Sequence, residues 1–211
     1  MNGNRFASIP PAVKNLIVVN VLMFLVMQFV PDFMIRTFAL FYPTSPYFKL
    51  FQPVTHMFMH ADFFHLFFNM YVLWMFGRII ELVWGTRKFL FYYFFTGIGA
   101  VGLSLFTQWL TASASIHSPV LGASGAVYGV LVAFAVMYPD VELQLIFPPV
   151  RFRAIWLAAI CVLIELLLGV IGANDNIAHF AHLGGMLFGF LLVRYWKRKG
   201  TLFQNDDFRN G

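Results

Sequence analysis

The chain has 211 residues, of which 60% are hydrophobic and only 11% are charged, and its formal net charge is +5. An ordinary soluble domain has roughly 25% charged residues, so this composition excludes a water-soluble globular protein and indicates one that is dissolved in a lipid bilayer. At about 20 residues for each spanning helix, the length allows about six spans. We therefore predict a single all-α membrane domain over residues 1–211.

Six apolar ranges follow one another along the chain and predict six transmembrane helices. The first range, 13–30, ends without a small-residue cleavage site, so we expect it to remain in the protein as a span. A long loop at 31–61 precedes the second span, and we expect it on the outer side. The predicted spans are 13–30, 63–80, 89–110, 122–138, 154–171 and 177–193.

The basic residues predict how these spans are oriented. If the N-terminus is inside, twelve of the fourteen Lys and Arg lie inside, and only Arg36 and Lys49 lie outside. Cytoplasmic loops carry an excess of Lys and Arg, so we predict an N-in, C-in topology. The positive charge then requires no nucleic acid, because the sequence offers no basic face interleaved with exposed aromatic residues.

Four polar residues lie near the starts of spans two, four and six, all of which enter from the outer face in this topology. They are His65, Asn69, Ser124 and His182. At about 1.5 Å per residue, each lies within roughly 10 Å of the outer boundary. Polar groups at such depth are costly unless they face the bundle interior or a water-filled cavity. We therefore predict a shared polar cavity that opens outward.

Small residues on spans four and six predict that these two helices approach closely. Gly125 and Gly129 are four residues apart on the fourth span, and Gly185 and Gly189 repeat that spacing on the sixth. If the two faces meet, the hydroxyl of Ser124 is brought to the imidazole of the sixth span.

This pairing predicts nucleophilic catalysis. An imidazole of His182 within about 3 Å would take the proton of the Ser124 hydroxyl and return it to the leaving amine. Tyr128, one turn below Ser124, would pack against the imidazole. Asp175 is the single acidic residue near the outer ends of spans four and six, so we predict a Ser–His dyad without the acid of a triad.

The developing oxyanion also needs donors. His65 and Asn69, together with the backbone N–H of Ser124, are the residues that we expect to supply them. Glu165, near the middle of the fifth span, has no part in this prediction. An ionisable residue inside a membrane is a functional candidate by default, but this one is equally explained as protonated or hydrogen-bonded to a neighbouring helix.

Three motifs in order resemble those of the rhomboid intramembrane serine proteases. They are H-x-x-x-N at 65–69, G-x-S-G at 122–125 and A-H-x-x-G at 181–185. The resemblance implies a six-helix rhomboid-like bundle in which Ser124 is the nucleophile and His182 the base, supported by Gly122, Gly125 and Gly185. It also implies cleavage of single-span membrane proteins near the outer boundary of the bilayer, without a cofactor.

One departure from the family pattern lies in the long loop. Many members carry Trp-Arg where this chain has Phe51 and Gln52, so a cationic contact to lipid headgroups or backbone does not carry over. His56 and His60 are spaced as metal ligands on a helix can be, but no acidic ligand accompanies them. We predict no metal there and expect hydrogen bonds that tie down the loop.

Other interpretations remain open from the sequence. A small proton-coupled transporter or channel would use Glu165 and the histidines as a relay, and an inactive rhomboid-like binder of membrane helices would need no catalysis. His179 is either a hydrogen-bonding neighbour of the site or an interfacial residue. The lone Cys161 is expected to be a buried, inert thiol. The absence of a transit peptide and of a seventh span favours a bacterial cytoplasmic membrane.

Overall fold

The computed structural model describes residues 9–111, 119–144, 151–171 and 176–203. Helices dominate these residues and follow the order of the predicted spans. The helices are α1 (Pro11–Phe29), α2 (Pro31–Phe38), α3 (Gln52–Thr55), the 3-10 turn η1 (His56–Phe58), α4 (Phe63–Val72), the π-helical turn η2 (Leu73–Gly77), α5 (Arg78–Trp84), α6 (Thr86–Leu110), α7 (Ser124–Met137), α8 (Ala154–Ile171) and α9 (Asn176–Arg198).

A helix covers most of each of the six ranges that the sequence predicts as spans. Four of the described helical stretches are long and apolar enough to cross a membrane: Pro11–Phe29, Phe63–Trp84, Thr86–Leu110 and Ala154–Ile171. α7 is apolar but has only 14 residues, and α9 is longer than predicted because it continues to Arg198. The chain is thus a helical membrane bundle.

The structure adds elements that the sequence did not predict. The loop at 31–61 contains α2, α3 and η1, and a small antiparallel hairpin joins α7 to α8. Its strands are β1 (Glu142–Gln144) and β2 (Arg151–Arg153), with Leu143 opposite Phe152.

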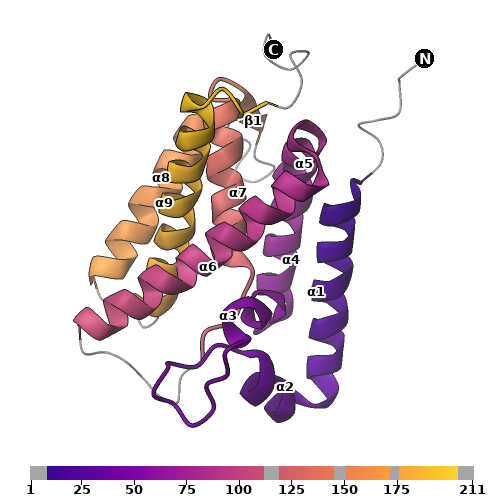
Figure 1. Ribbon diagram of the computed structural model, residues 1–211, viewed down its shortest axis with the longest axis vertical. Helices are drawn as coiled ribbons and strands as arrows, with labels where there is room; N and C mark the ends of the chain where they lie inside the picture. Colours follow the sequence, from indigo (N-terminus) through magenta and orange to yellow (C-terminus); the bar gives the residue numbers. More distant parts are fainter. Residues whose placement is uncertain (1–8, 112–118, 145–150, 172–175, 204–211) are drawn as a thin grey trace.

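The helices surround α7, which packs against α6, α8 and α9 on one side and against α4, η2 and α5 on the other (Figure 1). Eleven of its fourteen residues are buried. Only four of the eighteen residues of α8 are buried, namely Ala154, Ala158, Glu165 and Gly169. The spacing of these four places them on one face of α8, so the rest of this helix presents large apolar side chains outward.

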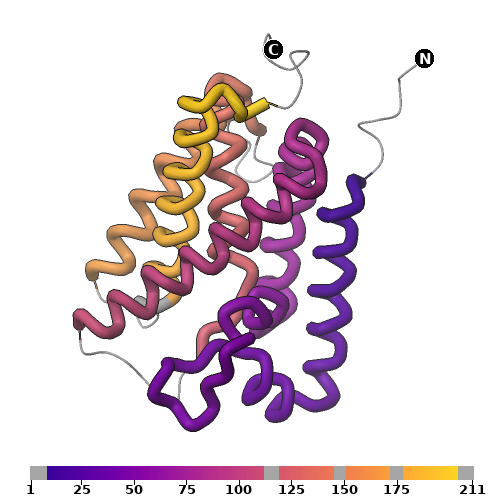
Figure 2. Tube along the Cα trace, in the orientation of Figure 1, coloured from indigo at the N-terminus to yellow at the C-terminus, as the bar shows by residue number. Residues whose placement is uncertain are grey.

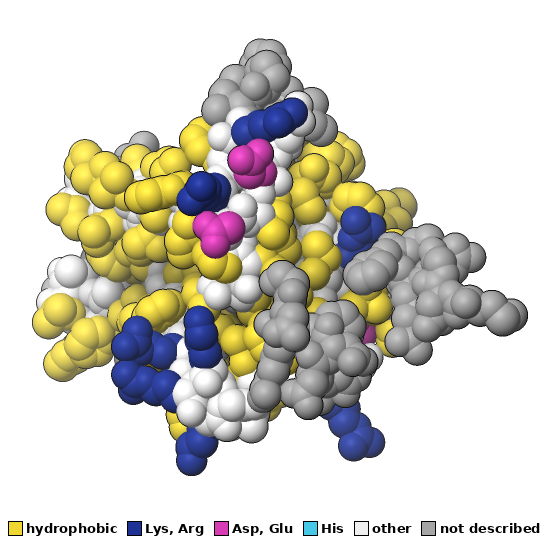
Figure 3. All heavy atoms as spheres, turned by 90° about the horizontal axis from the view of Figure 1, so that it is seen from above, with side chains coloured by type: hydrophobic (Ala, Val, Ile, Leu, Met, Phe, Trp, Pro, Cys, Tyr) yellow, Lys and Arg dark blue, Asp and Glu magenta, His cyan; other side chains and the backbone are white. Residues whose placement is uncertain are grey.

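The described part of the chain begins and finishes at the same end of the bundle. The tube in Figure 2 begins α1 and finishes α9 at the top, whereas α2 and the loop that follows it lie at the bottom. Figure 3, viewed from above, shows Lys and Arg side chains at the top end among hydrophobic ones. Exposed basic residues there include Lys14 at the start of α1 and Lys197 near the end of α9.

A buried carboxylate holds the start of α1 at this end. Glu81 of α5 accepts hydrogen bonds from the backbone N–H groups of Ala12 and Val13, each at 2.8 Å, and from the Thr86 hydroxyl at 2.8 Å. The first N–H groups of a helix have no partner within it, and the positive end of the helix dipole favours an anion. Gly85, with φ of 76°, then turns the chain into α6.

Candidate active site

The local backbone places Ser124 at the first residue of α7. Gly122, two residues earlier, has a φ of 130°, a conformation that side chains with a Cβ rarely adopt. A Cβ at this position would also lie 2.9 Å from the His65 ring. The N–H of Gly122 donates to the backbone oxygen of His56 at 3.0 Å, so the start of α7 is attached to the preceding loop.

The glycine faces of α7 and α9 meet. A Cβ on Gly185 would overlap the backbone carbonyl of Gly125, and one on Gly189 would lie 3.1 Å from the Cα of Gly129. Glycines of this spacing let two membrane helices approach until their backbones touch. This contact fixes the height of α9 against α7 and therefore the height of His182 against Ser124.

The structure brings Ser124 and His182 into direct contact. The Oγ of Ser124 lies 2.7 Å from the Nε2 of His182, within the range of an O–H···N hydrogen bond between a nucleophile and its base. Tyr128 stacks on the same imidazole, with ring centroids 4.6 Å apart and planes 26° apart. These three residues have the arrangement that the sequence predicts for them.

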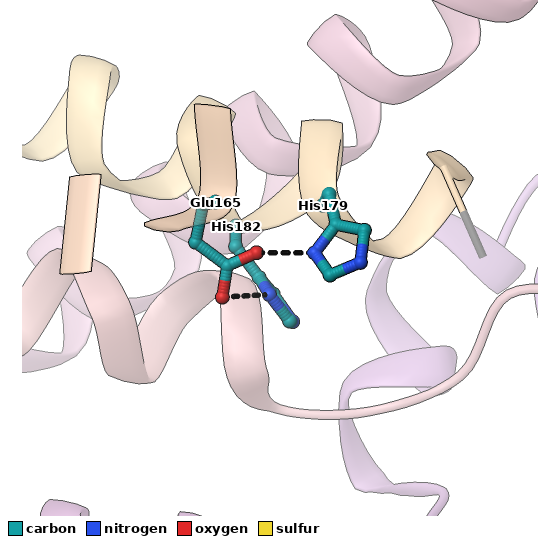
Figure 4. Close-up of side chains that lie close together, drawn as sticks. All are labelled: Glu165, His179 and His182. Atoms are coloured by element: carbon teal, nitrogen blue, oxygen red, sulfur yellow. Dashed lines mark hydrogen bonds and ion pairs between the residues drawn. The ribbon is translucent and has the colours of Figure 1, made fainter. Parts of the chain in front are cut away.

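Glu165 of α8 lies beside the imidazole (Figure 4), at the nitrogen that Ser124 does not contact. Its Oε1 is 2.9 Å from the Nδ1 of His182, and it also accepts a hydrogen bond of 2.7 Å from the Tyr128 hydroxyl. Its Oε2 is 2.6 Å from the Nδ1 of His179. The carboxylate is buried and contacts three polar side chains from two neighbouring helices.

The prediction that the pair has no acidic neighbour is therefore wrong. That prediction compared the depths of residues only on spans two, four and six, which enter from the outer face. α8 runs the other way, so Glu165, six residues before its end at Ile171, reaches the level of His182, six residues after the start of α9. Sequence reasoning missed this position of Glu165, although counting back from the outer end of the fifth span would have indicated it.

Two further residues of the sequence analysis lie near the site. His179 is a hydrogen-bonding neighbour of the site through Glu165. Cys161, one turn from Glu165 on α8, is partly exposed in the cavity beside Ser124 rather than fully buried.

A cavity of about 620 Å³ opens beside the Ser124 hydroxyl. Its walls come mainly from α4, η2, α7 and α8, and they include Phe68 of α4, Met75 of η2 and Leu157 of α8. His65 and Asn69 line it together with Ser124 and His182. The four polar residues predicted to share one cavity therefore do so.

One hydrogen of the Asn69 amide is used in a hydrogen bond within α4. Its side-chain Nδ2 donates to the backbone oxygen of His65 at 2.9 Å, and the amide has a second hydrogen to offer. Asp62 caps the start of α4 by accepting from the backbone N–H of His65 at 2.9 Å. α4 thus begins at a fixed point, and the residues proposed as oxyanion donors lie in its first two turns.

The loop before α4 is held by buried polar side chains. Gln52, fully buried, donates to the backbone oxygen of Tyr47 at 2.8 Å and accepts from the N–H of Phe41 at 3.2 Å. This neutral side chain satisfies the loop backbone from inside, while Phe51 beside it is about half exposed.

The two loop histidines are structural in their contacts. The Nδ1 of His56 lies 3.1 Å from the backbone oxygen of Gln52, which is a hydrogen bond within the loop as predicted. For His60 the expected hydrogen bond is not found among the described residues, and its ring instead packs against the His65 ring, with centroids 4.9 Å apart. Burial lowers the pKa of His56 to about 4 and the pKa of His60 to about 3, because a charged imidazole is poorly solvated there.

The side chains of Glu165, His179 and His182 are also of the types that bind metal ions. The ligand atoms of Glu165, His179 and His182 lie within 4.8 Å of one another, and zinc accepts such nitrogen and oxygen ligands. However, the Oε1 of Glu165 already accepts the Tyr128 hydroxyl. We therefore assign the cluster to hydrogen bonding.

By its fold and its site, this protein is a helical membrane protein that presents a serine and a histidine to a cavity between helices. The family follows from comparison with known sequences. A family model described as the rhomboid domain matches residues 47–199, well over half of the chain. The chain belongs to the rhomboid family.

Several relatives are similar over much of the chain. Presenilin-associated rhomboid-like protein, mitochondrial, of Homo sapiens is 33% identical over 198 residues, covering 90% of this chain and 51% of that protein. Rhomboid protein 1, mitochondrial, of Saccharomyces cerevisiae is 35% identical over 140 residues, covering 65% and 39%. Rhomboid-like protease 3 of Toxoplasma gondii is 30% identical over 161 residues, covering 76% and 57%. The chain spans about half the length of these curated relatives.

The relatives overturn the expectation of a bacterial cytoplasmic membrane. The human and yeast proteins are both named as mitochondrial. The expectation rested on the lack of a transit peptide and of a seventh span. Neither feature indicates a compartment in a chain that spans about half the length of its relatives.

Proposed function

We propose that this protein is a serine endopeptidase that cleaves peptide bonds of membrane-embedded substrates. The observation that carries the proposal is the 2.7 Å contact between the Ser124 Oγ and the His182 Nε2, at the wall of a cavity inside a membrane bundle. A serine hydroxyl becomes a nucleophile when a positioned base takes its proton. Membership of the rhomboid family, which includes a relative named as a protease, supports the same assignment.

In the proposed reaction, the Ser124 Oγ attacks the carbonyl carbon of the scissile bond while its proton moves to the Nε2 of His182. The imidazolium then gives this proton to the amide nitrogen, the C–N bond breaks and the amine leaves. Water attacks the acyl-enzyme and loses a proton to the Nε2. The Ser124 oxygen departs from the acyl group and regains that proton, which restores the starting state.

The oxyanion forms where three donors can meet it. The N–H of Ser124 is at the first residue of α7, where N–H groups have no partner within the helix. His65 and Asn69 line the same cavity, and the Asn69 amide has a second hydrogen to donate. Donors that are fixed in advance stabilise the developing charge without reorganising during the reaction.

We propose that single-span membrane proteins approach between α4 and α8. The cavity lies between these helices, and its walls are largely apolar. α8 buries few of its own residues, so a substrate helix meets apolar side chains on approach. In this proposal the helices of the six apolar ranges cross the bilayer, both chain ends are inside, and the Ser124 hydroxyl lies toward the outer side.

The experiment is cleavage of an artificial single-span substrate by the purified full chain in lipid vesicles. Ser124→Ala and His182→Ala are each expected to lower the rate by a factor of about 10³ or more, because the pair acts as a unit. Ser104→Ala, in the neighbouring helix α6, is the matched control and is expected to keep the activity. Unchanged cleavage by Ser124→Ala would contradict the proposal.

A serine-directed fluorophosphonate gives a second test. The wild type is expected to be labelled at Ser124, and His182→Ala is expected to lose the labelling because the hydroxyl is no longer activated. A folded wild-type protein that neither cleaves nor labels would instead indicate the inactive binder or the transporter.

A further inference from the structure

The carboxylate of Glu165 lies in an unusual place for a charged group. α8 otherwise presents large apolar residues outward, yet Glu165 is only 5% exposed. A buried carboxylate is strongly unfavourable unless hydrogen bonds or opposite charges compensate it. Here the Tyr128 hydroxyl and the Nδ1 of His179 do so, at 2.7 Å and 2.6 Å.

The contact between Ser124 and His182 determines which nitrogen of the imidazole must carry the proton. The Nε2 can accept the Ser124 proton only if it is unprotonated, and a neutral imidazole then carries its hydrogen on Nδ1. That hydrogen needs an acceptor inside the bundle. The Oε1 of Glu165, 2.9 Å from the Nδ1, is in the position to provide it.

We propose that Glu165 is a positioning residue for the reaction, and this proposal rests on the proposed function. It holds His182 in the Nδ1–H tautomer and compensates the positive charge that the imidazole carries once it has taken the Ser124 proton. His179 and Tyr128 hold the carboxylate in place. The site therefore works as a serine–histidine–glutamate unit whose three members come from three helices, α7, α9 and α8.

The resting geometry leaves room for this contact to strengthen. The two atoms are at hydrogen-bond distance, but the Nδ1–H of His182 does not point at an acceptor among the described residues. Catalytic hydrogen bonds are often poorly aligned in the unliganded state and tighten in the transition state. Once the imidazole is protonated, its attraction to the carboxylate would align the Nδ1–H of His182 with the Oε1 of Glu165.

The remaining groups that face His182 do not replace Glu165. Tyr128 on α7 stacks on its ring, and His179 on α9 lies edge-on to it. Cys161 on α8, His65 on α4 and Asp62 line the cavity that His182 also lines. The Asp62 carboxylate caps the start of α4 by accepting from the backbone N–H of His65. Among the described residues, Glu165 is the acidic side chain whose carboxylate lies within 4 Å of a nitrogen of His182.

The experiment compares Glu165→Gln with the wild type in the vesicle assay. Gln keeps the size and one acceptor oxygen but removes the charge. We expect kcat to fall by about 10²–10⁴ with little change in KM, and the midpoint of the acid limb of the rate–pH profile to move to lower pH. Glu165→Asp, which keeps a carboxylate, is expected to recover part of the rate. Glu142→Gln, in the β1 strand, is the matched control without effect.

The tautomer can be measured without any cleavage, so this inference is tested even if the proposed function fails. In ¹⁵N-histidine NMR of the folded protein in detergent, His182 is expected as the Nδ1–H tautomer in the wild type and in Ser124→Ala. In Glu165→Gln the Nε2–H form is expected to gain population. A wild-type His182 that carries its hydrogen on Nε2 would overturn the inference.

The outcomes separate the two proposals. Cleavage that is lost in Ser124→Ala but fully retained in Glu165→Gln supports the function and overturns the role of Glu165. Cleavage retained in Ser124→Ala contradicts the function itself. Loss of wild-type activity on treatment with a metal chelator, restored by Zn²⁺, would assign the cluster to a metal and overturn the positioning role.

Discussion

α7 and α8 are neighbouring apolar helices with opposite relations to their surroundings. α7 buries eleven of fourteen residues and is built mainly from Gly, Ala and Val, whereas α8 buries four of eighteen and is rich in Leu and Ile. Hydropathy does not distinguish them, because lipid and protein interior are equally apolar. The size of the side chains distinguishes them, because the small residues of α7 allow other helices to pack closely around it. On α8, the face that carries Glu165 turns inward.

The largest expected effect breaks the close packing around α7. Gly185→Val would drive side-chain atoms into the backbone of Gly125, so we expect a loss of about 3 kcal/mol or more in unfolding free energy, together with loss of activity. The measurement is unfolding in detergent.

Gly102→Ala is the control for this substitution, because a Cβ at Gly102 meets nothing within 4 Å. We expect the Gly102 variant to unfold like the wild type. Equal stability of the two variants would contradict the packing described for α7 and α9.

Acid is expected to weaken the loop that holds the start of α7. The pKa of His56 is lowered by burial to about 4 in the folded state, against about 6.5 when unfolded. The unfolded chain then binds more protons, so stability is present above pH 6.5 and is lost as the pH falls toward 4. For His56 the loss between pH 7 and pH 4 is about 3 kcal/mol.

The measurement is unfolding of the wild type and of His56→Gln as a function of pH. The variant does not titrate at this position, so its stability is expected to fall less between pH 7 and pH 4. An identical fall in both proteins would show that His56 is readily protonated in the folded state.

The smallest effects compare single side chains on the two helices. Phe134→Ala on α7 removes a buried ring that packs on Phe76, with centroids 4.7 Å apart. We expect a cost of about 2 kcal/mol, less than in a water-soluble core, because detergent also surrounds the ring with an apolar medium after unfolding. Leu163→Ala on α8, where the side chain is 55% exposed, is expected to stay within about 0.5 kcal/mol of the wild type. Unfolding in the same detergent measures both, and a reversed order would mean that α8 is the more tightly packed helix.

The sequence allowed the helical ranges and the pairing of Ser124 with His182 to be predicted, because both depend on local patterns. Apolar runs mark helices, and glycines at a spacing of four mark a close contact between two of them. The position of Tyr128 against the imidazole followed from the same helical periodicity. These features need only the sequence of one or two helices.

Features that join distant segments could not be predicted in this way. The contact of Glu165 with His182 depends on which face of α8 turns inward, and this is set by the packing of the whole bundle. Gln52 holds the loop through backbone groups eleven and five residues away, and no periodic pattern records such bonds. The hairpin β1–β2 is too short to have a pattern of its own.

The length of α7 has a consequence for how the bilayer meets the protein. Fourteen residues rise about 21 Å, about 9 Å less than a typical hydrocarbon core of about 30 Å. A helix this short in contact with lipid would force the bilayer to thin or the helix to recruit neighbours. Because longer helical stretches surround α7, we expect the mismatch to be absorbed inside the protein and the Ser124 hydroxyl to lie below the level of the lipid headgroups.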